Sequence, residues 1–143
     1  MRNGQILCPT DFSETASHAL SYAIEMANLY QVGFRLLHVV EQPMGDENFQ
    51  ILAITPEELA QSMEDAAAEK MKSLLAKLDS NLPIETMIRR GDAVTEILAE
   101  AEESHVGMIV IASHGRKGLS HFLHTNVAEA VANRAKCPVL VVK

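Results

Sequence analysis

The sequence predicts an α/β fold, a single domain over residues 1–143 in which a doubly wound, five-stranded parallel sheet carries helices on both faces. Short apolar runs alternate with segments of helical periodicity along the chain, which is typical of parallel strands joined by right-handed crossovers. The second run, residues 34–40, is apolar nearly throughout, as in a strand buried on both faces of its sheet. A length of 143 residues is enough for one domain with a substantial core.

The first strand and helix lie at the start of the chain. An apolar run at residues 5–8 is stopped by a proline, which predicts a short strand. Asp11 and Ser13 are both candidate N-caps for the helix that follows, and Asp11 has capping-box spacing with the glutamate three residues later. Apolar residues recur at i, i+3 and i+4 from 16 to 27, so we expect an amphipathic helix there, ended by Gly33.

The second strand is followed by an irregular acidic loop, residues 41–55, and then by a long helix. Thr55 and Pro56, followed by two glutamates, form a strong helix start, with an N-cap, a proline at the first helical position and acids in the first turn. The buried stripe of this helix is expected at Leu59, Met63, Ala67, Met71, Leu74 and Leu78.

The alternation of strands and helices continues to the end of the chain. Residues 84–88 alternate as a third strand, and Gly91 with Asp92 predicts a turn and an N-cap. The remaining elements are expected as a helix marked by Val94, Ile97, Leu98 and Ala101, a strand at residues 106–112, a helix at 127–135 and a final strand at Val139–Val142.

The composition restricts the kind of partner and the cellular setting. A formal net charge of −7 argues against a nucleic-acid polymer or an anionic membrane as the main partner, since both need a basic face. No apolar run approaches the roughly 20 residues that cross a bilayer, and the N-terminus does not read as a signal peptide. Cys8 and Cys137 each precede a proline and lack CxxC spacing. We therefore expect both cysteines to act as small apolar residues at strand ends, in a reduced, cytoplasmic protein.

A cationic loop between a strand and a helix is the first candidate site. Residues 113–118 read SHGRKG, follow the fourth strand, and precede a helix start at Thr125 and Asn126. Because a helix N-terminus carries unpaired N–H groups and partial positive charge, this segment predicts an anion site, with phosphate as the obvious ligand. Ligands of doubly wound sheets bind at the carboxyl ends of the strands, where we expect residues 9–11, 39–41 and 112–118 to converge.

Taken together, these segments resemble the universal stress protein (UspA) family over essentially the whole chain. The resemblance is carried by residues 8–13 (CPTDFS), 38–40 (HVV), 90–91 (RG), 111–120 (IASHGRKGLS) and 137–142 (CPVLVV). It implies a five-stranded parallel sheet of order 3-2-1-4-5, a homodimer through the final strand, and binding of ATP or AMP with Mg2+ and without a structural metal. The resemblance also implies that the protein acts as a sensor or adaptor in a stress response.

The resemblance also assigns site residues. Nucleotide-binding members carry a phosphate loop of the form G-x2-G-x9-G-[S/T], whose fixed positions fall at Ala112, Gly115, Thr125 and Asn126, so that only Gly115 matches. The residues implied as nucleotide contacts are, for adenine and ribose, Pro9, Thr10, Asp11 and Val39, and, from the loop and the helix start, Ala112, His114, Gly115, Arg116, Gly118, Thr125, Asn126 and Val127.

The three departures from the loop pattern leave the quality of phosphate binding open. The alanine at Ala112 adds one methyl group. If the family glycine at Thr125 needs a positive φ, the β-branched side chain is strained; if the position is a helix N-cap, threonine suits it. Asn126 can still offer a side-chain donor to a phosphate. The adenosine contacts are therefore better preserved than the phosphate contacts.

Several functions and residue roles stay open. We expect an adenine-nucleotide-binding homodimer without efficient catalysis; the alternatives are a nucleotide-free dimeric interaction protein and, third, a slow nucleotide hydrolase.

Asp11 is either a ligand contact or only a helix N-cap, and His38 is expected to be a core histidine with a hydrogen-bond partner. His121 and His124 lack a carboxylate or cysteine at ligand spacing, so we interpret them as surface or interface residues. No catalytic residue is assigned, since neither a Walker A lysine nor a nucleophile with an assignable base is found. The sequence does not identify a protein partner.

Overall fold

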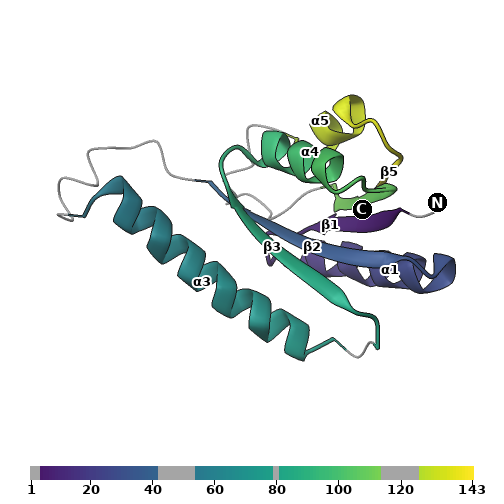
Figure 1. Cartoon of the computed structure of the whole chain (residues 1–143), viewed down its shortest axis with the longest axis horizontal. Helices are drawn as coiled ribbons and strands as arrows, with labels where there is room; N and C mark the ends of the chain where they lie inside the picture. Colours follow the sequence, from purple (N-terminus) through teal and green to yellow (C-terminus); the bar gives the residue numbers. More distant parts are fainter. Residues whose placement is uncertain (1–3, 42–53, 79–80, 114–125) are drawn as a thin grey trace.

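The structure, a computed structural model, describes residues 4–41, 54–78, 81–113 and 126–143. Its helices and strands follow the predicted order (Figure 1). They are β1 (Gln5–Pro9), α1 (Glu14–Tyr30), β2 (Gly33–Val40), α3 (Pro56–Ala76), β3 (Ile84–Arg90), α4 (Ala93–Glu103), β4 (Met108–Ala112), α5 (Val127–Arg134) and β5 (Val139–Val142). Most of the predicted acidic loop and most of the cationic loop lie outside the described residues.

The five strands form one parallel sheet in the order β3-β2-β1-β4-β5, which confirms the doubly wound fold. The chain leaves the central strand β1 toward β2 and β3, and later returns to β4 and β5 on the other side. The carboxyl ends of β1 and β4 therefore mark the point where the strand order reverses, which is where such sheets bind ligands. β5 lies at the edge of the sheet.

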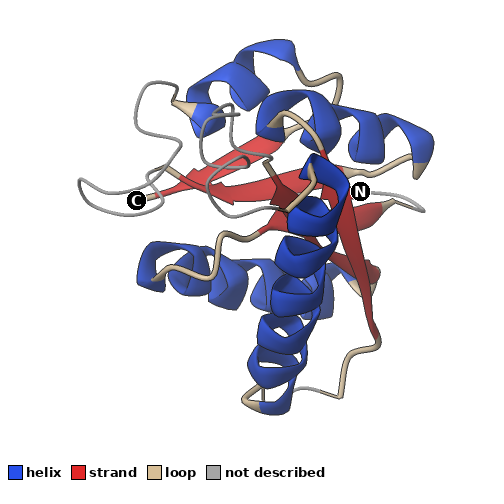
Figure 2. Ribbon diagram, turned by 90° about the vertical axis from the view of Figure 1, so that its left-hand side faces the viewer, coloured by secondary structure: helices blue, strands red, loops and turns tan. Residues whose placement is uncertain are grey.

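The sheet lies between two helical layers, with α1 and α3 on one face and α4 and α5 on the other (Figures 1 and 2). Side chains of β1 alternate between the two cores: Ile6 and Cys8 contribute to the α1/α3 core and Leu7 to the α4/α5 core, all fully buried. β1 is thus held by apolar packing on both faces, and the turn that follows it starts from a fixed position.

The end of α1 corrects the prediction that Gly33 terminates this helix. The left-handed residue is Gln31, with φ 52° and ψ 52°, and the Val32 N–H donates to the Ala27 carbonyl oxygen at 3.1 Å. This pattern closes the helix with a glutamine where glycine is commoner. Gly33 instead opens β2, where an added Cβ would lie 3.0 Å from Gln5 Nε2.

Helix α3 begins as predicted, with Pro56 in its first turn and Thr55 Oγ1 accepting from the Glu58 N–H at 3.0 Å. Its buried residues are Ala60, Ala67 and Met71, of which Ala60 was not predicted. The other members of the predicted stripe are partly buried: Leu59, Met63, Leu74 and Leu78.

Four strand boundaries differ from the predicted ones. β1 extends one residue further, to Pro9, and β2 begins one residue earlier, at Gly33. β3 continues to Arg90, two residues beyond the predicted end. β4 begins at Met108 rather than at Val106, because the Val106 N–H donates to the Ala101 carbonyl oxygen at 2.9 Å and so closes α4. Helix α5 ends at Arg134, one residue before its predicted end.

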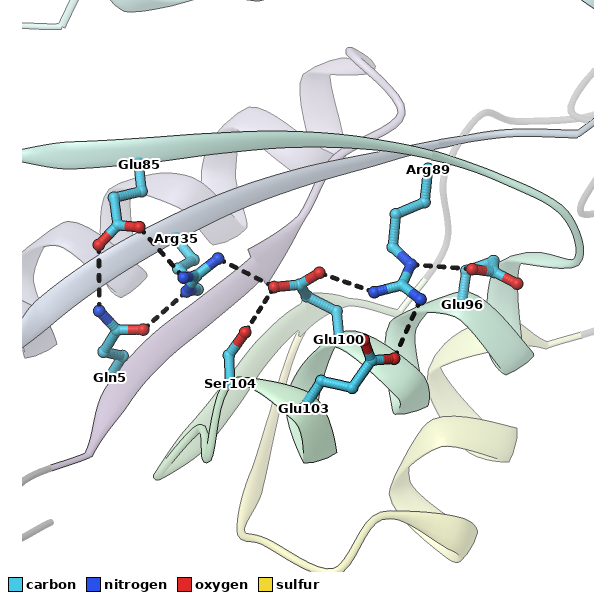
Figure 3. Close-up of polar contacts among 8 residues, drawn as sticks. All are labelled: Gln5, Arg35, Glu85, Arg89, Glu96, Glu100, Glu103 and Ser104. Atoms are coloured by element: carbon cyan, nitrogen blue, oxygen red, sulfur yellow. Dashed lines mark hydrogen bonds and ion pairs between the residues drawn. The ribbon is translucent and has the colours of Figure 1, made fainter.

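A buried charged network joins α4 to the sheet, and no sequence pattern had marked it (Figure 3). Its centre is Glu100, which is 2% exposed. One carboxylate oxygen accepts from Arg35 Nη1 at 2.9 Å and from Ser104 Oγ at 2.7 Å, and the other accepts from Arg89 Nη1 at 2.9 Å. The network thus links β2, β3 and α4 through one carboxylate.

The two arginines of this network have further acidic or polar partners. Those of Arg35 are Gln5 and Glu85, and those of Arg89 are Glu96 and Glu103. Burial by itself raises the pKa of Glu100. The hydrogen bonds from Ser104 and Arg89 and the charges of both arginines outweigh burial, so its pKa lies below the ordinary value.

Candidate functional site

The candidate site lies along the carboxyl ends of the parallel strands, a border of the sheet that we call its carboxyl edge. Pro9 ends β1, Val39 lies near the end of β2 and Ala112 ends β4, while Asn126 and Val127 start α5. The structure therefore places these predicted residues, together with the turn after β1, along the edge where the strand order reverses. The other predicted contacts lie outside the described residues: His114, Gly115, Arg116, Gly118 and Thr125.

Thr10 is the most buried polar residue of this edge, at 7% exposure. Its N–H donates to the Leu37 carbonyl oxygen at 2.8 Å, which extends the β1–β2 pairing past the end of the strand. Its Oγ1 accepts from the Phe12 N–H at 3.0 Å, and its carbonyl oxygen lies 2.7 Å from His38 Nδ1. Hydrogen bonds to β2 and to the turn that follows β1 therefore hold Thr10 in place.

Asp11 does not cap α1, which corrects one of its two predicted roles. The N-cap is Ser13, whose Oγ accepts from the Ala16 N–H at 3.1 Å. Asp11 Oδ1 accepts from the Ser13 N–H at 2.9 Å, which closes a turn one step before the helix. The carboxylate is therefore held in a defined orientation at the sheet edge.

Phe12 has an uncommon backbone conformation that the sequence did not reveal. Its φ is 67°, in the left-handed region that favours glycine. The Phe12 ring lies against the His38 ring, with centroids 4.6 Å apart and planes at 40°. Lys70 Nζ on α3 lies 5.7 Å from the Phe12 ring centroid, within cation–π range.

His38 is partly buried and has a hydrogen-bond partner, as predicted. Since a carbonyl oxygen only accepts, the contact with Thr10 requires that His38 Nδ1 carries the proton. Burial lowers the pKa of His38 below its ordinary value, and so does the charge of Lys70. The hydrogen bond to Thr10 and the charge of Asp11 act in the opposite direction without reversing the shift.

The exit from β2 is tied to the start of α4. The Val40 carbonyl oxygen accepts from the Gly91 N–H at 3.0 Å, and Glu41 Oε1 accepts from the Ala93 N–H at 2.8 Å. Asp92 caps α4 as predicted, accepting from the Thr95 N–H at 3.0 Å. These bonds fix the backbone beside Val39, which is 7% exposed.

The start of α5 tests one of the two interpretations of Thr125, a residue that lies outside the described part of the chain. The N-cap is Asn126, whose Oδ1 accepts from the Glu129 N–H at 3.0 Å, so the interpretation of Thr125 as the N-cap is wrong. The Asn126 side chain thereby satisfies one of the N–H groups that a helix start offers to an anion. On the β4 side, the Ser113 N–H donates to the Val142 carbonyl oxygen at 2.8 Å.

Neither a metal-binding cluster nor a membrane-spanning helix is present among the described residues. No group of three or more His, Cys, Asp or Glu side chains in this part of the chain could hold a metal ion. No helix among the same residues is long and apolar enough to cross a membrane.

Comparison with known proteins gives a consistent result. The family model described as "Universal stress protein family" matches residues 3–143. Universal stress protein MJ0577 of Methanocaldococcus jannaschii is 32% identical over 152 residues, covering 97% of this chain and 94% of that protein. Universal stress protein YxiE of Bacillus subtilis is 26% identical over 145 residues, covering 97% of this chain and 98% of the relative.

Solved structures show the same fold. The structure of MJ0577 superposes with a TM-score of 0.80 at 32% identity, covering 100% of this chain and 97% of that one. The universal stress protein UspA of Lactobacillus plantarum gives a TM-score of 0.78 at 22% identity, covering 100% of this chain and 99% of that one.

Proposed function

The chain belongs to the universal stress protein family, and from this premise we propose that it binds an adenine nucleotide, ATP or AMP, at the carboxyl edge of its sheet. The proposed contacts to adenine and ribose are Pro9, Thr10, Asp11 and Val39. The proposed contacts on the phosphate side are those of the loop and the start of α5, with Mg2+ accompanying the phosphates of ATP. Such a protein acts as a stress-response sensor or adaptor and has no efficient catalytic activity. It acts as a sensor because nucleotide occupancy alters the protein surface around the site.

The observation that carries the proposal is the ordered turn after β1. Thr10 and Asp11 accept hydrogen bonds from the Phe12 and Ser13 N–H groups and lie where the strand order reverses. A turn that is already ordered loses little further conformational entropy on binding, which favours affinity. The Asp11 carboxylate is an acceptor for the two hydroxyl groups of a ribose.

The start of α5 indicates that the phosphates would be bound more weakly than the adenosine. The Asn126 side-chain oxygen already accepts from the Glu129 N–H, so that donor is occupied before any ligand arrives. We therefore expect ATP, ADP and AMP to bind with affinities within about tenfold of one another, since the shared adenosine supplies most of the binding energy.

Calorimetric titration of the purified protein with ATP, ADP and AMP tests the proposal. Asp11→Asn removes the charge, keeps an oxygen for the Ser13 N–H, and is expected to weaken binding by about tenfold or more. Glu14→Gln is the matched control, because it makes the same chemical change at an exposed position three residues away and should leave the affinity unchanged. Absence of both heat and thermal shift at millimolar nucleotide contradicts nucleotide binding.

A cyclic nucleotide belongs in the same series. One universal stress protein was solved in complex with cAMP, with a TM-score of 0.62 and 20% identity to this chain. That likeness shows the fold alone, so cAMP enters as a probe of the adenosine contacts.

A nucleotide-free interaction protein is the second candidate, and the capping role of Asn126 favours it. The same titration separates the two, because this candidate gives no heat with any nucleotide. In either case we propose a cytoplasmic setting, which the free thiols of Cys8 and Cys137 support. The partner of such a protein is a further protein, not yet identified, rather than a nucleic-acid polymer or a membrane.

A homodimer through β5 is part of the proposal. Among the described residues β5 pairs with β4 alone, and Val141 is 38% exposed. An apolar edge strand with unpaired backbone groups is covered by pairing with a second copy. Sedimentation at micromolar concentration is expected to show a dimer, which Val141→Lys disrupts and the control Leu29→Lys on α1 leaves intact. A wild-type monomer contradicts the dimer.

A further inference from the structure

The turn that presents Thr10 and Asp11 contains a backbone conformation that needs support. Phe12 has φ 67°, and a bulky residue in the left-handed region is uncommon. Such conformations persist where surrounding contacts hold them, and they cluster at ligand sites. The contacts around Phe12 therefore determine how firmly Thr10 and Asp11 stay in place.

His38 supplies the polar part of this support. Its Nδ1 donates to the Thr10 carbonyl oxygen across 2.7 Å, from the neighbouring strand β2. Thr10 is 7% exposed, so water does not readily replace this bond. The bond fixes the carbonyl group immediately before Asp11.

The Phe12 ring supplies the apolar part. Its centroid lies 4.6 Å from the centroid of the His38 ring and 5.7 Å from Lys70 Nζ. The Phe12 N–H donates to Thr10 Oγ1 at 3.0 Å, so both the ring and the backbone of Phe12 are engaged. These contacts join the turn after β1 to β2 and α3.

We propose that His38 is a positioning residue for nucleotide binding and that His38, Phe12 and Thr10 form a latch on the turn after β1. His38 holds the Thr10 carbonyl group and the Phe12 ring, and it makes no contact with the nucleotide itself. The proposal rests on the proposed function. Loss of the latch leaves Thr10 and Asp11 chemically intact, but the nucleotide must then order the turn, which weakens its affinity.

Two substitutions of His38 separate the hydrogen bond from the side-chain volume. His38→Leu keeps an apolar side chain and removes the donor, and it is expected to weaken AMP binding by roughly fivefold to thirtyfold. His38→Asn places an amide donor near the position of Nδ1 and is expected to bind AMP within about threefold of wild type. Phe34→Leu is the matched control, because Phe34 is 1% exposed at the other end of the same strand.

Hydrogen exchange of the Phe12 and Ser13 amides, measured by NMR without nucleotide, provides the second readout. Exchange of these two amides is expected to rise at least about fivefold more in His38→Leu than in Phe34→Leu, and to return toward wild type in His38→Asn. The control corrects for a general loss of stability, which affects both variants.

The two readouts keep the latch and the proposed function apart. Wild-type protein that binds no AMP contradicts the proposed function, while the exchange rates still decide whether the latch exists. Unchanged exchange of the Phe12 and Ser13 amides in His38→Leu overturns the latch. If the wild type binds AMP, equal affinity in His38→Leu overturns the positioning role.

Discussion

Replacing Glu100 by glutamine is expected to destabilise the protein strongly, although the two side chains have nearly the same shape. Glu100 is 2% exposed and accepts hydrogen bonds from Arg35, Arg89 and Ser104 (Figure 3). A glutamine has one acceptor oxygen, and its amide group presents donors to the second arginine. The substitution therefore breaks the buried ionic contacts of Glu100. A neutral amide replaces the carboxylate that Arg35 and Arg89 share.

The size of the effect follows from the partners that remain. Breaking a buried ion pair costs about 3–5 kcal/mol. The side chains of Arg35 and Arg89 are 17% and 22% exposed, and each keeps further acidic partners. We therefore expect the lower end, about 3 kcal/mol, which for a domain of this size lowers Tm by about 6–12 °C.

Glu103→Gln is the matched control. It lies on the same helix and also pairs with Arg89, but its side chain is 66% exposed, so the same chemical change is expected to cost less than about 1 kcal/mol. Urea titration of both variants measures the difference. Equal losses of stability in Glu100→Gln and Glu103→Gln refute the reasoning.

The pH dependence provides a second check on Glu100. Its pKa in the folded protein lies below the ordinary 4.5, so its contribution is present above that pH and is lost as the pH falls through the folded pKa. Glutamine does not titrate. The stability difference between wild type and Glu100→Gln is therefore expected to shrink in acid below about pH 4.5, and a constant difference contradicts this account.

Three more residues give outcomes that can be checked in the same preparation. Gly91→Ala is expected to cost about 1–3 kcal/mol in urea titration, because Gly91 has φ 142° and an added Cβ lies 2.8 Å from Glu96 Oε2; an unchanged midpoint contradicts this. Burial lowers the pKa of His38, so stability is expected to fall as the pH drops below the ordinary 6.5 toward the folded pKa, and an NMR titration giving a pKa at or above 6.5 refutes it. Burial raises the pKa of the Cys8 thiol to about 12, so iodoacetamide at neutral pH should modify Cys137 and leave Cys8 intact until the protein unfolds; equal labelling by mass spectrometry is the contrary result.

Local features of the fold could be predicted from the sequence, and features that depend on distant pairing could not. The order of helices and strands along the chain and the caps at Thr55 and Asp92 follow from patterns within a few residues, and the structure confirms them. The predicted end of α1 was wrong because Gln31, and not the nearby Gly33, adopts the left-handed conformation that closes the helix. Glu100 was missed because its arginine partners are brought to it by the pairing of β2 with β3, and Arg35 lies 65 residues away in sequence.

The candidate site shows the same division. The positions of Thr10 and Asp11 at the carboxyl edge follow from the βα order, which is why the sequence located them. The contact of Phe12 with His38 depends on a left-handed backbone and on strand pairing, and neither is visible in the sequence. The helix predicted at residues 127–135 left its N-cap open between Thr125 and Asn126, and the hydrogen bond from the Glu129 N–H to Asn126 Oδ1 identifies Asn126.

A crystal structure of the protein grown with millimolar AMP tests the central claim most directly. The account predicts density for adenosine at the carboxyl edge of the sheet, with the ribose against Asp11 and the base beside Thr10 and Val39. An empty edge at that concentration, or AMP bound elsewhere on the protein, contradicts the account.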